Sequence, residues 1–173
     1  MELIYWFGKK GTQVCPCGYY NHPEKECVCG PGVVQKYLNR ISGPLLDRID
    51  LHVEVVPVSV SEISQTADGE KSTFIRERVI NARKIQEQRF EGSSIHSNAQ
   101  MTSKQVKEIC VISTAGQTLL NKAMDKLGLS ARAYDRILKV SRTVADLAGS
   151  DDIKIEHLAE AIQYRSIDKE FKK

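Results

Sequence analysis

The stretch "SARAYDRILKVSRTVADLAG", residues 130–149, decides the fold, because it has the features of a complete amphipathic helix. Ser130 suits the N-cap at its start, and Gly149 suits the stop at its end. Its apolar side chains recur at helical spacing, at Ala133, Ile137, Val140 and Val144. A helix with such a stripe buries it against other elements, so the stretch predicts a helical bundle.

Further segments with helical spacing flank this stretch. They are residues 72–90, 101–110, 113–128 and 155–165. Thr102 and Gln105 have the spacing of a capping box at the start of the second segment. Thr114 and Gln117 repeat this spacing at the start of the third, with Thr114 as the expected cap. Residues 70–170 are therefore predicted to form a compact bundle of four or five helices.

Residues 1–60 have a different pattern and predict a small mixed α/β piece. A helix is expected over residues 33–41 and a strand over residues 50–56, which Pro57 would end. Residues 58–71 have the composition of a linker. One strand and a helix cannot bury a sheet, so this piece is expected to be the edge of a larger domain.

The bulk composition indicates an ordinary globular protein. Of the 173 residues, 27% are charged and 41% hydrophobic, and the formal net charge of +3 is too small to indicate a dedicated nucleic-acid binder. No apolar run approaches the length of a membrane helix, which is about 18 residues or more. The first residues lack the charged region and cleavage site of a signal peptide, so we expect a cytoplasmic protein.

The loop "CPCGYYNHPEKECVC", residues 15–29, contains four of the five cysteines as two Cys-x-Cys pairs. These are Cys15, Cys17, Cys27 and Cys29. Zn²⁺ prefers four such ligands in a tetrahedron, and His22 could replace one of them. In an extended Cys-x-Cys the side chains point to opposite faces, so the backbone must turn sharply, which Pro16 can permit. The pattern leaves three interpretations open: a structural metal site, a loop of reduced or partly disulfide-bonded thiols, and a redox centre. The fifth cysteine, Cys110, lies on an apolar helical face and is expected in the core.

Two groups of arginines are candidate phosphate ligands. Arg48 in "LLDRID" lies between two aspartates, where it could form a surface ion pair or reach a phosphate on a neighbouring subunit. The second group forms a run on the predicted helix at residues 130–149: Arg132, Arg136, Lys139 and Arg142. It indicates either a solvated helix flank or a helix whose first turn faces an anion.

The sequence lacks the glycine-rich phosphate loop G-x-x-x-x-G-K-[ST] and an apolar run ending in Asp-Glu that would hold Mg²⁺. This chain alone is therefore not expected to assemble a nucleotide site.

Four phrases, in this order, resemble the C-terminal part of the magnesium-chelatase-like AAA+ ATPases, the ComM/YifB group. They are "CPCGYYNHPEKECVC", "YLNRISGPLLDRIDLHVEV", "GLSARAYDRILKVSRTVADLAGS" and "EHLAEAIQYRS". The resemblance implies a mainly α fold in which residues 70–170 form the helical lid and residues 1–60 the end of the α/β core. It implies a phosphate loop and an acidic Mg²⁺ motif in upstream sequence, so that ATP and Mg²⁺ bind only the full-length protein.

The resemblance also implies roles for individual residues. Arg48 matches the arginine finger, which reaches ATP bound to the next subunit of a homo-oligomeric ring. Arg132 matches the sensor 2 arginine of the lid, with Arg136 as the reserve. Members of the family are associated with DNA, as hexameric motors in branch migration during natural transformation. Where the family reads Met-Asn-Pro before Cys-Pro-Cys, this chain has Gln13 and Val14, which puts the sensor asparagine in doubt.

Two hypotheses follow for the function of the chain. The first is a nucleotide-responsive fragment of an AAA+ ATPase that supplies Arg48 and Arg132 and hydrolyses nothing alone. The second is a nucleic-acid- or protein-binding helical module whose arginines contact the phosphate backbone.

Overall fold

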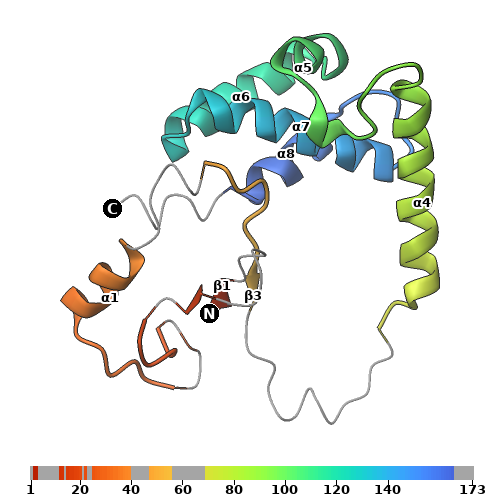
Figure 1. Cartoon of the computed structure of the whole chain (residues 1–173). Coiled ribbons are helices and arrows are strands. Elements are labelled where there is room, and N and C mark those ends of the chain that lie inside the picture. Colours follow the sequence, from red (N-terminus) through yellow and green to blue (C-terminus); the bar gives the residue numbers. More distant parts are fainter. Residues whose placement is uncertain are drawn as a thin grey trace. The chain divides into compact units, whose positions relative to one another are not determined.

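The structure is a computed structural model, and its described residues fall into several ranges. They are residues 2–3, 12–13, 15–20, 22, 25–39, 47–55 and 69–165. The chain divides into two compact units, Met1–Ala67 with Ser166–Lys173, and Asp68–Arg165. Among the described residues α-helices predominate, and strands are limited to three of two residues each (Figure 1). The predicted mainly α fold is confirmed. None of the described helices is both long and apolar enough to cross a membrane.

The first unit contains one described helix, α1, at Pro31–Leu38. It begins two residues before the predicted start at residue 33, because Pro31 takes the first helical position. Proline suits this position, since its missing N–H would have no helical partner there. The last two residues of the predicted helix, 40 and 41, lie outside the described residues.

The strands of the first unit form an antiparallel sheet in the order β2-β1-β3. They are β1 at Glu2–Leu3, β2 at Thr12–Gln13 and β3 at Glu54–Val55. The prediction of a strand over residues 50–56 was too long, since residues 51–53 are not in a strand. Within the described residues, β3 pairs with β1 at Glu54 and Val55, opposite Leu3 and Glu2. Pro57 and most of the predicted linker lie outside the described residues.

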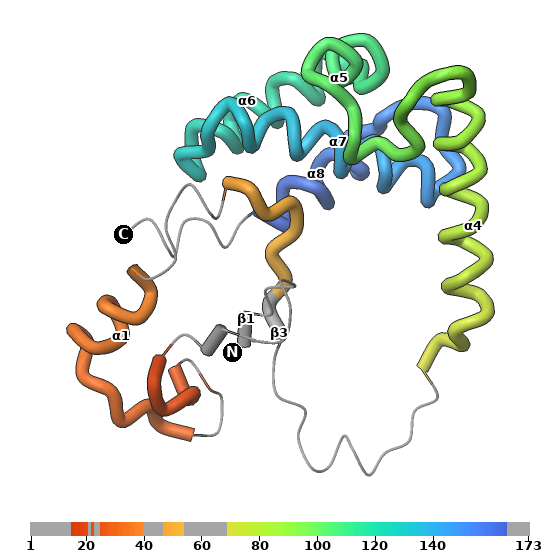
Figure 2. The backbone as a smooth tube through the Cα atoms, in the orientation of Figure 1, coloured from red at the N-terminus to blue at the C-terminus, as the bar shows by residue number. Residues whose placement is uncertain are grey.

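The second unit is a helical bundle built around α7. Its elements are α4 (Ser72–Arg89), η1 (Asn98–Gln100), α5 (Ser103–Ile109), α6 (Thr114–Leu127), α7 (Ala131–Leu147) and α8 (Ile155–Gln163). Helix α7 packs against α4, η1, α5 and α8 (Figure 2). Residues 72–81 of α4 are all exposed, and only the C-terminal half of α4 contributes to the core.

Local hydrogen bonds fix where the bundle helices begin. The predicted capping box of Thr102 and Gln105 is present at α5, and Ser130 caps α7 by accepting from the Ala133 N–H at 3.3 Å. The predicted cap of α6 was wrong by one residue. Ser113, not Thr114, is the cap, and its Oγ accepts from the Gly116 N–H at 3.1 Å. Ser113 has the extended backbone that an N-cap requires, whereas Thr114 is already helical.

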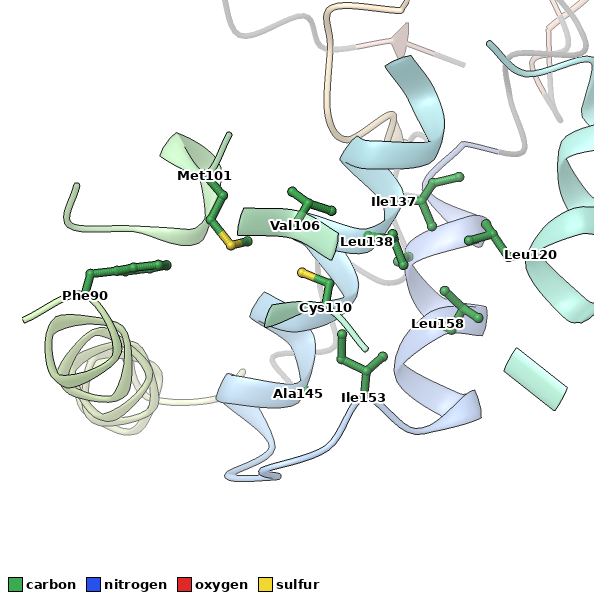
Figure 3. Packing of buried hydrophobic residues seen from close by; sticks show 11 residues of the cluster. Phe90, Met101, Val106, Cys110, Leu120, Ile137, Leu138, Ala145, Ile153 and Leu158 are labelled. Atoms are coloured by element: carbon green, nitrogen blue, oxygen red, sulfur yellow. The ribbon is translucent and has the colours of Figure 1, made fainter. Parts of the chain in front are cut away.

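The hydrophobic core lies where α5, α6, α7 and α8 meet, and Figure 3 shows side chains from these elements converging there. From the predicted stripe of α7, Ala133 and Ile137 are fully buried. Val140 is only half-buried. Val144 is also half-buried, and Leu138 and Ala145 take the buried positions instead, because α7 has neighbours on more than one side. Cys110 is in this core, as predicted.

A buried polar network joins three elements of the bundle around the Asp146 carboxylate. The Asp146 side chain is 0% exposed. Arg89 of α4 donates to its two oxygens at 2.7 and 2.5 Å, and Asn98 of η1 donates at 2.7 Å. Arg142, one turn earlier in α7, donates to Asp146 at 3.1 Å. It also donates to the carbonyls of Ser150 and Asp151, just beyond the end of α7. The network therefore holds α7 against α4 and η1, and it also holds the chain segment that follows α7.

Removing the Asp146 charge should strongly destabilise the protein. Asp146→Asn leaves Arg89 and Arg142 without their carboxylate, and breaking a buried ion pair in this way typically costs about 3–5 kcal/mol. Urea unfolding followed by circular dichroism would measure the loss. Glu108→Gln is the matched control, because its pair with Lys104 is exposed and 3.9 Å long, and it should cost about 0.5 kcal/mol or less. Equal losses in the two variants would contradict a structural role for the network.

The same network should make stability depend on acid pH. Burial alone would raise the pKa of Asp146, but hydrogen bonds from Arg89 and Asn98 and the Arg142 charge hold it below its ordinary value of 3.8. The native state therefore binds fewer protons at this site than the unfolded state. Stability from Asp146 should be complete above about pH 5 and fall as the pH passes through and below 3.8. Unfolding free energies at several pH values should fall less steeply in Asp146→Asn than in the wild type. The same slope in both would assign the acid sensitivity to other groups.

Candidate metal centre and arginine positions

A tight turn brings the first two cysteines of the loop to the same side. The Gly18 N–H donates to the Cys15 carbonyl at 3.1 Å, and Gly18 has a φ of +80°. This left-handed conformation suits glycine, and Pro16 suits the second position of the turn. The sharp bend that a Cys-x-Cys pair needs is therefore built by Pro16 and Gly18, the residues on either side of Cys17.

The four cysteine sulfurs converge on one point. The Sγ atom of Cys15 lies 3.3 Å from that of Cys17 and 3.7 Å from that of Cys27, and the last two are 3.5 Å apart. With Cys29 included, all four sulfurs lie within 4.8 Å of one another. Cys15 is fully buried and the others are half-buried. All four are free thiols. This cluster can hold a metal ion.

The thiols of the cluster have divergent acidities. The pKa of Cys17 is lowered to about 6, chiefly by a backbone hydrogen bond from Tyr19. A backbone hydrogen bond from Cys29 lowers the pKa of Cys27, but burial and the sulfurs of Cys17 and Cys15 outweigh it and raise the value to about 12. The neighbouring sulfurs of Cys17 and Cys15 thus disfavour ionisation of Cys27. Cys110 differs, because burial in the core raises its pKa to about 11.

His22, the possible substitute ligand, is not part of the cluster. Its Nδ1 accepts from the Lys25 N–H at 3.2 Å, and its ring meets that of Tyr19 edge-on, with 5.6 Å between centroids. The Lys25 ammonium lies 4.9 Å from the centroid of the same Tyr19 ring. His22 therefore contacts its loop neighbours Tyr19 and Lys25, and among the described residues the candidate ligands are the four cysteines.

Arg48 lies in a turn of the first unit, and its side chain is exposed. Among the residues that the structure describes, it forms no ion pair with the flanking Asp47 or Asp50. Its guanidinium is therefore available to an external ligand.

The four basic residues of α7 do not form one surface. Arg132 is exposed and, within the described part of the chain, has no hydrogen-bond partner. Arg136 is half-buried and engaged in an interaction within the protein. Lys139 donates to the Ala99 carbonyl at 3.0 Å, and Arg142 is buried in the Asp146 network. Of the four, Arg132 is the best placed to bind a ligand.

Sequence reasoning missed two features of the second unit. The first is the buried role of Arg142, which its spacing of four residues from Asp146 could have signalled. The second is a cavity of about 530 Å³ between α4, η1 and α7. Arg83 and His96 line it, and no local motif marks them.

Two family models match the chain in the order of its two units. The model described as "Magnesium chelatase, subunit ChlI" matches residues 10–63. The model described as "Magnesium chelatase, subunit ChlI C-terminal" matches residues 69–165, which is nearly the whole helical unit.

Curated relatives give the same result. The competence protein ComM of Haemophilus influenzae is 43% identical over 153 residues, which are 88% of this chain and 29% of ComM. The uncharacterized proteins YifB of Salmonella typhimurium and of Escherichia coli are each 38% identical over 155 residues, 89% of this chain and 29% of theirs. The chain therefore spans less than a third of the length of these relatives. It belongs to the magnesium-chelatase-like family of ComM and YifB, as the resemblance in its sequence predicted.

Proposed function

We propose that the chain is the C-terminal part of a ring-forming AAA+ ATPase, to which it contributes an arginine finger and a helical lid. The observation that carries the proposal is that Arg48 and Arg132, the two arginines matched to ATP contacts, are both exposed. An arginine that served only the fold would be expected to have a partner, as Arg142 does.

Arg48 would act in trans, on ATP bound to the neighbouring subunit. A guanidinium offers a planar fork of donors that fits phosphate oxygens, and it stabilises the charge that develops during phosphoryl transfer. Its place in a turn, between Asp47 and the strand β3, supports this role, because an exposed turn can present the side chain outward.

Arg132 would act in cis, on nucleotide held by its own subunit. It lies in the first turn of α7, where the helix dipole also favours an anion. Arg136 remains the reserve for this role.

The nucleotide itself would be held by sequence that this chain does not contain. ATP and Mg²⁺ need a phosphate loop and an acidic motif, and neither occurs among these 173 residues. Gln13 stands where the family has its sensor asparagine, so we assign no sensor role to this position. The four-cysteine cluster is a second, separate metal candidate, and Zn²⁺ is the ion expected from its donors.

DNA is the proposed substrate of the whole motor, in the cytoplasm. This rests on the family resemblance and on one relative being named a competence protein. The alternative, a binding module that contacts phosphates through the basic residues of α7, receives less support. Lys139 and Arg142 are both committed to contacts within the bundle.

The finger assignment predicts a selective loss of turnover. In a full-length relative, Arg→Ala at the position of Arg48 should lower ATP turnover by about 10³-fold or more while ATP binding persists, since the finger acts on the transition state. Steady-state hydrolysis and nucleotide binding would be measured together. Arg→Ala at the position of Arg76, an exposed arginine of α4, is the matched control. Normal turnover in the Arg48 variant would show that the assignment is wrong.

The isolated chain should hydrolyse ATP only at background level.

The two hypotheses differ in what the α7 arginines do in the isolated chain. Arg142→Ala breaks a buried ion pair and should lower the free energy of unfolding by about 3–5 kcal/mol. Arg132 is exposed, so Arg132→Ala should change it by about 0.5 kcal/mol or less. Thermal and urea unfolding would measure both changes in stability.

DNA binding by the isolated chain would be followed by fluorescence anisotropy at several salt concentrations. Salt-dependent binding that is lost in Arg132→Ala would favour the binding-module alternative.

A further inference from the structure

The N-terminal part of the chain lacks a hydrophobic core among its described residues. In residues 15–39 the buried described side chains are those of Cys15 and Val34. Among the described residues, the buried hydrophobic cluster lies in the second unit, from Phe90 to Ala161. Small segments without a core generally need a disulfide or a metal to fold.

Helix α1 also lacks a side-chain cap at its start. Its N-cap is Gly30, which forms no side-chain capping bond, and an isolated helix of eight residues is unstable in water. Cys29 directly precedes Gly30, so a constraint on the Cys29 sulfur is also a constraint on the first turn of α1.

The sulfur positions fit one ion with four ligands. Sulfurs at about 2.3 Å from a shared Zn²⁺ lie about 3.8 Å apart, and the three sulfur pairs among Cys15, Cys17 and Cys27 are separated by 3.3–3.7 Å. A disulfide would need about 2.05 Å, so these contacts are not covalent bonds. In a multinuclear iron–sulfur cluster the four cysteines are divided among two or more iron atoms, so their sulfurs do not all surround one point. Between single ions, such a site binds Zn²⁺ more tightly than Fe²⁺.

We propose that one Zn²⁺, bound by the thiolates of Cys15, Cys17, Cys27 and Cys29, is the interaction that folds residues 15–38, including α1. The inference rests on the metal function proposed above for the cluster and adds what the metal does there. Four protein ligands leave no open position, so the centre is structural rather than catalytic. Each protonated thiol releases its proton on binding, and the free energy of binding becomes folding free energy of the loop and α1.

The experiment uses the full 173-residue chain, purified under reducing conditions without chelator. Elemental analysis should find about one equivalent of zinc and no stoichiometric iron. Hydrogen exchange with mass spectrometry, before and after removal of zinc with a chelator, should show α1 amides exchanging faster by on the order of 10-fold or more. Helix α7 is the internal control and should not change. Cys27→Ala should reproduce the effect, whereas Cys110→Ala should keep both the zinc and the protection of α1.

The outcomes separate the metal site from its proposed role. Less than about 0.1 equivalent of zinc, with all thiols reduced, would overturn both. Stoichiometric iron in place of zinc would overturn the identity of the ion. One equivalent of zinc with unchanged exchange at α1 would leave the metal site standing and overturn its role in folding. None of these results depends on ATP turnover, so each is independent of the ATPase proposal.

Discussion

The carboxylate of Asp146 is the constraint on which the helical unit depends. Arg89, Asn98 and Arg142 donate to this one group, and they come from α4, from η1 and from α7 itself. A carboxylate with no exposure to water is tolerated only when its charge and lone pairs are satisfied. The three elements must therefore meet in one arrangement, which defines the place of α4 beside α7 more sharply than apolar packing could. Arg142 extends the effect by holding the chain where it leaves α7.

This constraint also sorts the arginines by function. On a helical wheel, the basic residues of α7 look alike, and all are candidates for phosphate contact. The Asp146 network commits Arg142 to the interior, and a backbone carbonyl holds Lys139. Arg132 remains exposed at the start of the helix, where we propose that it contacts nucleotide. The structural arginine and the candidate functional arginine thus lie on one helix and differ in burial.

The described parts of the two units differ in the interactions that they contain. The second unit has a contiguous apolar cluster, capped helices and a satisfied buried ion network. In residues 15–39 the described residues contain instead a cluster of four cysteine sulfurs, which lie within 4.8 Å of one another. A centre of this kind can fold a short segment without an apolar core, because the free energy of metal binding replaces that of hydrophobic burial.

The sequence by itself determined the helices of the second unit, the starts of α5 and α7, and the family. Caps depend on hydrogen bonds between residues three apart, such as Thr102 with Gln105, so a short stretch contains all the information. The cap of α6 was misplaced by one residue because Ser113 and Thr114 are adjacent and chemically equivalent. The tertiary structure alone decided the distant partners of Asp146, since Arg89 and Asn98 are 57 and 48 residues away along the chain. It also decided that four sulfurs share one point and His22 does not. Burial and convergence depend on which distant segments meet, and no local pattern encodes that.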